Sequence, residues 1–552
     1  MKKSSVIIIA FFLLLYVAPL GVRPMVFPDE FRYAEIAREM LTSGDWVVPR
    51  LDGLRYFEKP VLGHWLNAIA IGMFGENAFA ARFFSALAAG AMALMVFVLA
   101  RNYAGILLAG TLAAAMLLTC VEVFAVSTFS VLDGMFSAFM TVALGMFFMA
   151  YMADKPRKRM GFFALFGISC GLGFLTKGFL AFAIVGVTII AFLLWQGRTH
   201  KLLRAWWIPA ATLVSVILPW CVMIQLREGD FWRYFFWTEH INRFLSPQNG
   251  QHAEPFWFYV PYILGGSFPW LFVLPAAMTG LKEMRLKNPL VRFSLCWLVF
   301  PFLLMSASSG KLGTYVLPCF PPFVILVTVG LLKSFAVGEK RSFAIAAYLL
   351  AGIVASLLAA LFLSQTFLAD FRLFEQYETP KAVLAAVGLL AFALFLLCAA
   401  RAADFPRKLA YFALSPVVFM FCLHFAIPDR LIEKKAPERF LRQYEGRITS
   451  NVLLVSDNYL VSAVCWCYKR DDVFILGRAG ELEYGLEYAD SKHRLLNIDQ
   501  LRQLMTGRSD KERIAMVLNA KRYEEHKGLL PRPVFEKIDD HFVFAEFSPQ
   551  TR

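Results

Sequence analysis

Long apolar stretches recur along this 552-residue chain and restrict it to one broad kind of fold. A helix of about 20 apolar residues can cross a bilayer, and thirteen stretches come near that length. Hydrophobic residues make up 59% of the chain and charged residues 17%, whereas soluble domains average about 45–50% and about 25%. Disorder and a disulfide scaffold are excluded. The predicted spans are 5–22, 79–100, 104–126, 134–152, 161–176, 178–195, 205–225, 257–279, 290–306, 312–332, 342–364, 380–400 and 409–427.

The loops between these stretches differ in charge from one side of the membrane to the other. Alternate loops together hold 19 Lys and Arg against four Asp and Glu, which accounts for the net charge of +14. Basic loops stay in the cytoplasm, so the N-terminus is predicted to be cytoplasmic and the C-terminus external. Residues 1–22 are read as an anchor and not as a cleaved signal peptide. The basic excess therefore does not indicate nucleic-acid binding.

The chain is predicted to have two parts. Residues 1–429 form an all-α polytopic bundle that includes two long outer loops, 23–78 and 226–256. Residues 430–552 are nearly neutral and contain short buried strands, which predicts a small soluble α/β domain with two free thiols, Cys465 and Cys467. One alternative is open for the pair 161–176 and 178–195, which a re-entrant hairpin would also explain.

The first outer loop carries the densest polar pattern. Residues 27–41 read as a helix on the membrane surface, and the spacing of Asp29, Arg32 and Tyr33 places them on one face. Asp29 could instead only complement the helix dipole. A second amphipathic stretch, 61–74, follows an acid–base–aromatic segment. The remaining candidate site residues of this loop are Asp45, Asp52, Arg55, Tyr56, Glu58, Lys59 and His64.

Three isolated charges lie near the outer ends of other spans. Asp133 is an acid close to membrane depth, where acids are rare and usually functional, although it could simply cap the next helix. Lys177 and Lys311 each lie beside Gly and near Ser or Thr, which predicts phosphate binding by side chain and backbone. Snorkelling to lipid phosphate is the alternative for a single Lys.

The second outer loop, 226–256, mixes charged and aromatic residues, a composition typical of a headgroup interface or a sugar site. His240 could ligate a metal together with a carboxylate such as Glu58, but a lone His is more often a hydrogen-bonded surface residue. His64, His252 and His424 are read as structural for the same reason.

Four motifs together resemble a known family. They are the segment 28–40, Gly44-Asp45-Trp46-Val47-Val48-Pro49, Arg55-Tyr56-Phe57-Glu58-Lys59-Pro60 and Thr176-Lys177-Gly178. The chain resembles the lipid A 4-amino-4-deoxy-L-arabinose transferases of Gram-negative bacteria, over its whole length. A shorter core is shared with other polyprenyl-phosphate-sugar transferases of the GT-C class, such as protein O-mannosyltransferases.

The resemblance implies a GT-C membrane enzyme of the inner membrane that acts on the periplasmic face. It would move aminoarabinose from undecaprenyl phosphate to a lipid A phosphate, which confers resistance to polymyxin. It implies that Asp29 and Asp133 are catalytic-cavity acids and that Glu58 and His240 hold a structural zinc ion. No cofactor is needed for the chemistry, and a monomer is expected, embedded in membrane lipids. The donor-phosphate and cavity residues would be Arg32, Tyr33, Tyr56, Lys59 and Tyr315.

The chemistry of that reaction agrees with the residues. Cations such as Lys59, Arg32 or Lys177 would stabilise a phosphate leaving group, and an acceptor phosphate needs no strong general base. Asp29 would orient the acceptor and stabilise positive charge on the sugar; Asp133 could bind the sugar ammonium group. Two alternatives are a protein O-mannosyltransferase and, from a different class, a lipid transporter, which would need polar groups near the membrane midplane.

Overall fold

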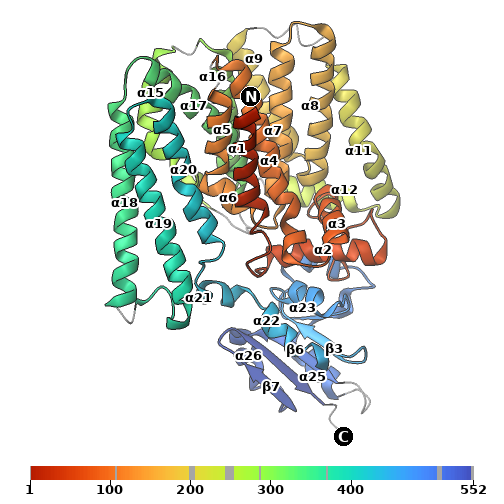
Figure 1. Cartoon of the computed structure of the whole chain (residues 1–552). Helices are drawn as coiled ribbons and strands as arrows, with labels where there is room; N and C mark the ends of the chain where they lie inside the picture. Colours follow the sequence, from red (N-terminus) through yellow and green to blue (C-terminus); the bar gives the residue numbers. More distant parts are fainter. Residues whose placement is uncertain are drawn as a thin grey trace. The chain divides into compact units, whose positions relative to one another are not determined.

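The computed structural model describes residues 2–105, 108–197, 206–242, 254–284, 287–367, 371–506 and 513–548. It divides into two compact units (Figure 1). The bundle unit comprises Met1–Val22 and Arg82–Ile427, and the sheet unit comprises Arg23–Ala81 and Pro428–Arg552. The first outer loop therefore packs with the C-terminal residues, whereas the sequence assigned it to the membrane part.

Among the described residues, nine helices are long and apolar enough to cross a membrane, or eleven if each of two bent pairs is one span. The predicted spans 5–22 and 178–195 correspond to shorter apolar helices. The nine are α4 (Ala78–Tyr103), α7 (Leu132–Met152), α8 (Pro156–Lys177), α11 (Trp207–Arg227), α16 (Pro289–Ala307), η6 with α17 (Gly313–Ala336), α18 (Arg341–Thr366), η8 with α19 (Gln376–Arg401) and α20 (Phe405–Leu423); the shorter ones are α1 (Lys2–Phe12), followed by the π-helix Leu13–Val17, and α9 (Leu180–Gln196).

Two spans predicted to be continuous are broken. The helices α5 (Leu108–Leu118) and α6 (Val121–Ser127) meet at 61°, and the segments Phe256–Gly266 (η4, α14) and Trp270–Glu283 (η5, α15) meet at 91°. Pro269 has no N–H to continue a helix. Polar groups at the two breaks form hydrogen bonds with one another. Val121 N–H donates to Phe268 O at 3.2 Å, and Trp270 Nε1 donates to Thr119 Oγ1 at 2.9 Å. Irregular backbone inside a bundle requires such pairing.

The helices α7 and α8 form an antiparallel hairpin that brings charge to one end of the bundle unit. Asp133 lies in the first turn of α7, and Lys177 is the last residue of α8. An acid at a helix N-terminus and a base at a C-terminus both match the helix dipole. The hairpin therefore places opposite charges side by side at helix ends that favour them.

The sheet unit is built around a six-stranded mixed sheet of order β5-β4-β3-β6-β8-β7. The first four of these strands are parallel, and β8 and β7 extend the sheet in antiparallel fashion. Five elements match the predicted strands and helices: β3 (Leu453–Ser456), β4 (Phe474–Leu476), β6 (Ile514–Asn519), α23 (Val461–Tyr468) and α25 (Ile498–Thr506). Five further elements were not predicted: β5 (Leu495–Leu496), β7 (Phe535–Ile538), β8 (Phe542–Phe547), α22 (Glu438–Arg442) and α26 (Ala520–Lys527).

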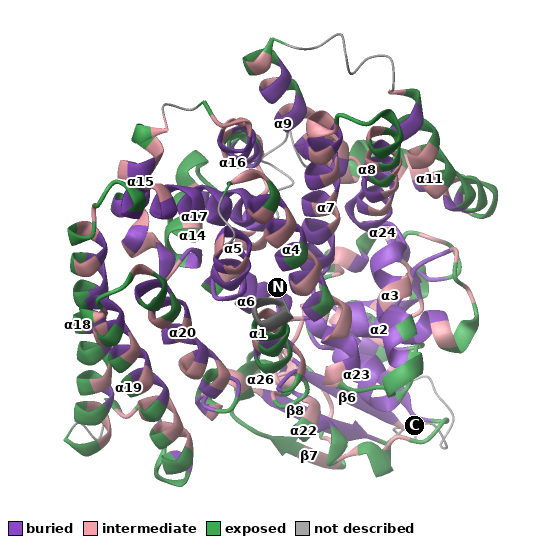
Figure 2. Cartoon of the chain, turned by 45° about the horizontal axis from the view of Figure 1, so that its top comes forward, coloured by how far each residue is buried: buried purple, intermediate pink, exposed green. Residues whose placement is uncertain are grey.

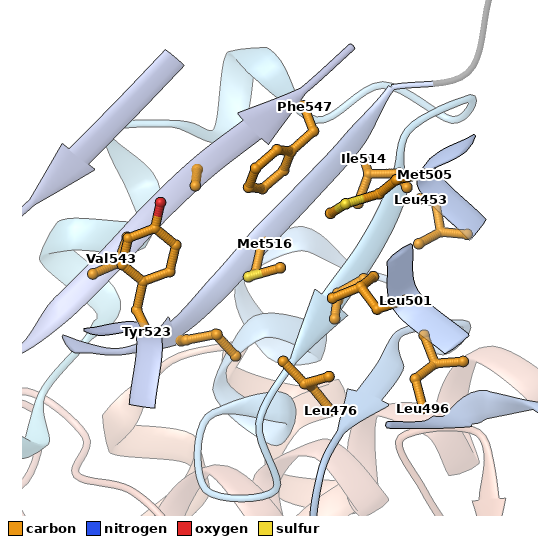
Figure 3. Close-up of a cluster of buried hydrophobic side chains, with 13 residues drawn as sticks. Leu453, Leu476, Leu496, Leu501, Met505, Ile514, Met516, Tyr523, Val543 and Phe547 are labelled. Atoms are coloured by element: carbon orange, nitrogen blue, oxygen red, sulfur yellow. The ribbon is translucent and has the colours of Figure 1, made fainter. Parts of the chain in front are cut away.

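One face of this sheet carries its hydrophobic core (Figure 3). Side chains from alternate strand positions, such as Met516 and Leu518 on β6, meet α25 through Leu501 and Met505. Alternation places residues two apart on the same face of a strand. Cys465 and Cys467 are buried free thiols, as the sequence predicted.

The first outer loop completes the sheet unit. It holds α2 (Asp29–Ser43), a short hairpin of β1 (Arg50–Leu51) and β2 (Leu54–Arg55), and α3 (Leu62–Phe74). Asp52 and Gly53 turn the hairpin with positive φ angles of 57° and 78°, the Asp-Gly signature of a tight turn. Both predicted helices are confirmed.

The polar residues in the middle of α2 are buried inside the sheet unit. Arg38 and Glu39 are each only 5% exposed, and Glu35 is fully buried. These polar side chains find partners within the unit: Arg38 Nε donates to Glu35 at 2.8 Å, and Gly53 N–H donates to Glu39 at 2.9 Å. The polar face of α2 is therefore an internal contact surface, not one that lies against water.

Candidate functional site

Three charged residues of the sheet unit meet at the first turn of α2, two of them from the helix itself and one from the C-terminal residues. Asp29 is the first residue of the helix, and its side chain is 44% exposed. Arg32, three residues later, places Nη1 3.3 Å from Asp29 Oδ1 and 2.8 Å from Glu481 Oε2. The predicted shared face of Asp29 and Arg32 is therefore present, and the C-terminal residues add a second carboxylate to it.

Arg32 is a well-buried cation among acids and phenols. Burial alone lowers its pKa, but Glu481, then Tyr56, Tyr33 and Asp29, together outweigh burial and raise the pKa well above its usual value. The guanidinium therefore remains charged at any physiological pH. A permanent cation beside a partly exposed carboxylate suits the recognition of a phosphate group.

Three rings lie next to this group. The rings of Tyr33 and His64 are 6.0 Å apart, and those of Tyr56 and His64 are 6.3 Å apart. Burial, reinforced by Glu58, raises the pKa of Tyr56 well above its usual value, so its hydroxyl remains a neutral donor. Burial and then Lys59 lower the pKa of His64 to about 3, so the imidazole is uncharged.

Several polar atoms beside these rings have no protein hydrogen-bond partner among the described residues. They are the hydroxyl of Tyr56, both ring nitrogens of His64, and both side-chain polar atoms of Asn67. Buried polar atoms are usually paired. His64 was read from the sequence as an ordinary residue, but its full burial between two predicted site tyrosines gives it a place in the candidate site.

Glu58 and Lys59 lie on the segment between β2 and α3. Lys59 Nζ is 3.9 Å from Glu58 Oε2 and donates to Glu58 O at 2.9 Å. Both side chains are mostly buried, 10% and 13% exposed. The sequence placed both in the candidate site, and the structure brings them together in one unit with Arg32, Tyr33 and Tyr56, which share electrostatic interactions with one another.

A second charged group lies in the bundle unit. Lys177 Nζ donates to Asp133 Oδ1 at 2.7 Å and stands 4.4 Å from the ring centre of Tyr315. Tyr315 belongs to the short 3-10 helix Gly313–Cys319. Three residues that the sequence named from distant segments therefore meet in one cluster, in which the two charged side chains are buried and Tyr315 is half-buried. A lysine that faces both a carboxylate and an aromatic ring is fixed in position.

Lys311 has a different environment. Its ammonium group is buried and donates to the backbone carbonyls of Glu254 and Ser308. Those bonds tie the start of the segment Phe256–Gly266 to the end of α16. A role for Lys311 in binding phosphate stays a prediction. Its observed hydrogen bonds connect two chain segments, one before Phe256 and one after α16.

The zinc prediction concerns residues in different units, Glu58 in the sheet unit and His240 in the bundle unit. His240 Nδ1 lies 2.7 Å from Phe235 O, the bond that commonly orients a zinc-ligating imidazole. Two protein ligands are fewer than the four of a closed structural zinc site, so zinc on this pair needs additional ligands. Arg243, Phe244 and His252 of the same loop lie outside the described residues.

Another group of metal-ligating residue types occurs in the sheet unit. Among the described residues, Glu35, Asp52 and Cys465 offer ligand atoms within 4.8 Å of one another. Each carboxylate already has a partner, since Arg38 pairs with Glu35 and Ser462 donates to Asp52 at 3.0 Å. Burial raises the pKa of the Cys465 thiol well above its usual value, which disfavours the thiolate that metals bind. The group therefore joins α2 to α23 as a structural contact.

Two family descriptions match the chain. Residues 3–235 match the dolichyl-phosphate-mannose-protein mannosyltransferase family, and residues 432–546 match the C-terminal domain of arabinosyl transferase ArnT. An undecaprenyl phosphate-alpha-4-amino-4-deoxy-L-arabinose arabinosyl transferase from Shewanella sediminis is 38% identical over 503 residues, 89% of each chain. Its counterpart from Serratia proteamaculans is 37% identical over 531 residues, 95% of this chain and 94% of the relative. This chain belongs to the aminoarabinose arabinosyl transferase family.

The fold of this family member agrees with a solved structure. The crystal structure of ArnT from Cupriavidus metallidurans in the apo state superposes with a TM-score of 0.82, at 22% identity, over 99% of this chain and 98% of that one. The form of that protein bound to undecaprenyl phosphate gives a TM-score of 0.80. The predicted fold, a helical membrane bundle with a small C-terminal mixed domain, is confirmed.

For this transferase family member, sequence reasoning missed Glu481 and assigned His64, a residue of the first outer loop, a structural role. Glu481 carries no motif, and only the packing of the C-terminal residues against α2 reveals it as a partner of Arg32. His64 had a usable signal, because it follows Lys59 by five residues within the charged first outer loop. Burying a polar side chain in an apolar helix costs free energy unless the side chain has a partner. A polar residue such as His64 in an apolar helix is therefore a better candidate for a function than a polar residue on the surface.

Proposed function

We propose that this chain transfers 4-amino-4-deoxy-L-arabinose from undecaprenyl phosphate to a phosphate of lipid A. The observation that supports this most strongly is the family membership, with 37% identity to a named arabinosyl transferase over 95% of the chain. The chain is an arabinosyltransferase with a polyprenyl-phosphate-linked sugar donor. The lipid A acceptor, the periplasmic site, the inner membrane and the resulting resistance to polymyxin belong to the proposal.

The reaction breaks one bond and forms one bond at the sugar. The bond from the anomeric carbon to the undecaprenyl phosphate oxygen breaks, and its electron pair leaves with the phosphate. A lipid A phosphate oxygen forms the new bond to the same carbon. Because the acceptor is already an anion, no strong general base is required.

Each unit, taken by itself, holds a cation cluster with the chemistry to stabilise a leaving phosphate. In the sheet unit, Arg32 is permanently charged and Lys59 lies in the same cluster. In the bundle unit, Lys177 is held by Asp133 and Tyr315. Preorganised charges in a site that excludes water stabilise developing charge more than the same charges in water.

Asp29 is proposed to orient the acceptor and to stabilise positive charge on the sugar. Its side chain is partly exposed and lies 3.3 Å from Arg32, so the carboxylate is accessible to a ligand. Asp133 is buried and paired with Lys177, which favours a role in fixing that lysine or in binding the sugar ammonium group. A zinc ion held by Glu58 and His240 would have a structural role, ordering the loops, and no role in the transfer step.

Mass spectrometry of lipid A from cells with and without the protein tests the proposal. The expected result is a gain of one aminopentose that depends on the protein, and its absence would reject the function. Asp29→Asn is expected to abolish the gain while the protein remains inserted and folded. The matched control is Asp499→Asn, because Asp499 occupies the first turn of α25 and is also exposed.

A second candidate function is protein O-mannosyl transfer, which the match of residues 3–235 favours. That reaction needs a base for a neutral hydroxyl acceptor. Purified protein supplied with a lipid A precursor or with a Ser- and Thr-rich peptide separates the two functions. Transfer to the peptide and not to the lipid would replace the proposal by the second function.

A further inference from the structure

A crevice lies between the two long helices α18 and α19 of the bundle unit. It has a volume of about 770 Å³ and is lined by both helices and by Arg372, Phe374 and Gln376, which lie between them in the sequence. In Figure 1 these two helices run side by side at one side of the bundle unit. No residue of the candidate active site lines this crevice. Its lining is mainly apolar, with Arg372, Gln365, Gln376 and Thr379 as polar exceptions.

The crevice exists because small residues face each other. Ala355 and Ala359 lie four apart on α18, and Ala382 and Ala386 lie four apart on α19, so each pair shares one helix face. Larger side chains such as Leu358, Phe362 and Val383 flank these alanines. The gap is therefore a groove with a narrow apolar floor, the shape that an acyl chain fills.

The groove is accessible from the bilayer. Only 33% of the apolar window of α18 and 28% of that of α19 is buried inside the molecule. Figure 2 shows exposed and half-exposed residues along both helices. The surface that surrounds the groove is therefore the surface that meets lipid.

The length of the groove matches one leaflet. Ala355 precedes the end of α18 at Thr366 by eleven residues, which is about 16 Å of helix at a rise of about 1.5 Å per residue. The hydrocarbon core of a bilayer is about 30 Å thick. Measured from the end of α18, the groove therefore has about the length of one leaflet of hydrocarbon.

A cation stands at the mouth of the groove. Arg372 makes no ion pair with any described residue, and its buried Nε has no hydrogen-bond partner among them. The nearby acids Glu375 and Glu378 have partners close by in the sequence. They form a reciprocal cap of η8 (Gln376–Glu378), which leads into α19, and Glu378 also pairs with Lys381 at 2.8 Å. Arg372 is therefore the cation at this mouth whose charge is not used by the described residues.

Gln365 fixes the segment that carries Arg372. The hydrogen-bond pattern orients its amide so that the oxygen accepts from the N–H groups of Leu373 and Phe374, and the nitrogen donates to Phe374 O, each at 3.0 Å. One side chain of α18 thus binds the backbone directly after Arg372. The guanidinium is held at the groove by the fold and not by a charge partner.

We propose that the α18–α19 groove binds an anionic phospholipid, with its phosphate on Arg372 and one acyl chain along the four alanines. A guanidinium makes paired, charge-assisted hydrogen bonds to phosphate oxygens, and the apolar floor buries the chain next to it. This site is separate from the transfer reaction and does not depend on the proposed function.

Native mass spectrometry of the full-length protein tests the site, with dioleoylphosphatidylglycerol and dioleoylglycerol as the probes. The expected result is retention of the phosphatidylglycerol on the wild type and a loss of about tenfold or more in affinity for Arg372→Gln. Arg401→Gln is the matched control, because Arg401 is an exposed cation at the opposite end of α19. It should retain the lipid as the wild type does.

A second variant tests the apolar floor without changing charge. Ala386→Phe fills the groove and should lower retention of the same lipid, and thermal unfolding in detergent checks that it folds. If it fails to fold, Arg372→Gln alone still decides the phosphate contact. The proposal would be overturned if Arg372→Gln and Arg401→Gln lost the lipid equally, or if the wild type retained the uncharged diacylglycerol as well as the phosphatidylglycerol. It would also be overturned if the groove preferred lipid A to the phospholipid, or if inorganic phosphate displaced the phosphatidylglycerol from the wild type and from Arg372→Gln equally.

Discussion

Lys177 Nζ donates a 2.7 Å hydrogen bond to Asp133 Oδ1, which joins the last residue of α8 to the first turn of α7. Both side chains are nearly buried, 6% and 11% exposed. A buried ion pair is costly to break from one side only, because the remaining charge has no partner. The pair therefore fixes the hairpin end and at the same time holds a lysine at Tyr315.

Lys177→Met is expected to destabilise the protein by about 3–5 kcal/mol, since Asp133 would be left charged and buried. Thermal unfolding in detergent measures this. The double variant Asp133→Leu/Lys177→Met should recover much of the stability but no transfer activity. A single variant as stable as the wild type would show that the pair contributes nothing to the fold.

Glu481→Gln should raise the KM for the donor lipid several-fold and leave the protein folded. The change removes the 2.8 Å partner of Arg32 and frees its guanidinium to change position, while the pair itself contributes only about 1 kcal/mol to stability. Steady-state kinetics with varied donor measures the effect. Glu483→Gln is the control, because Glu483 is exposed two residues away; equal kinetics for the two variants would contradict the prediction.

His64→Phe is expected to leave the pH profile of transfer unchanged between about pH 5.5 and pH 8. Burial and then Lys59 lower the pKa of His64 to about 3, so the imidazole is neutral throughout that range. Its contribution to stability is complete above its ordinary value of 6.5 and is lost as the pH falls towards 3. A titration near pH 6.5 that disappears in the variant would show that the ring ionises.

Asp52 should make the sheet unit less stable as the pH rises. Burial raises its pKa from 3.8 to about 6, although Ser462 and then Arg494 act in the opposite direction. A raised carboxyl pKa gives stability that is complete below the unfolded value and is lost as the pH rises through the folded value. The melting temperature of the wild type, relative to Asp52→Asn, should therefore fall between about pH 4 and pH 6.

Comparison with Asp52→Asn is needed because neighbouring groups titrate as well. Burial raises the pKa of Glu35 and of Glu39 in the same cluster, and the Asp52 carboxylate raises both pKa values further. His64 acts in the opposite direction over an overlapping range. A difference between the two proteins that does not change with pH would contradict the shift assigned to Asp52.

Local patterns predicted the elements that hold the site. The helix at 27–41, the amphipathic stretch at 61–74 and the strand at 514–518 all appear, as α2, α3 and β6. Their signals are periodicity, capping and apolar runs, which depend on neighbours in the sequence. Strands β7 and β8 were missed, although the run Phe542–Phe547 is rich in aromatic residues typical of strands.

Long-range packing could not be predicted from these patterns. An amphipathic helix has the same periodicity whether its polar face meets water or a polar protein surface, so the packing of α2 against α23 was not predicted. The bend at Thr119 was missed for a similar reason, because its partners lie near Trp270, far away in the sequence. The pairs Lys177–Asp133 and Arg32–Glu481 likewise join residues whose spacing carries no signal.

The assembly of the sheet unit from two ends of the chain has a consequence for biogenesis. The ribosome finishes Arg23–Ala81 early, but Pro428–Arg552 emerges only after every span between them has been synthesised. Until then Glu35, Arg38 and Glu39 lack the covering of α23. Ribosome stalling or proteolysis before the last segment therefore leaves a nascent chain in which the buried charges of α2 have not yet been covered.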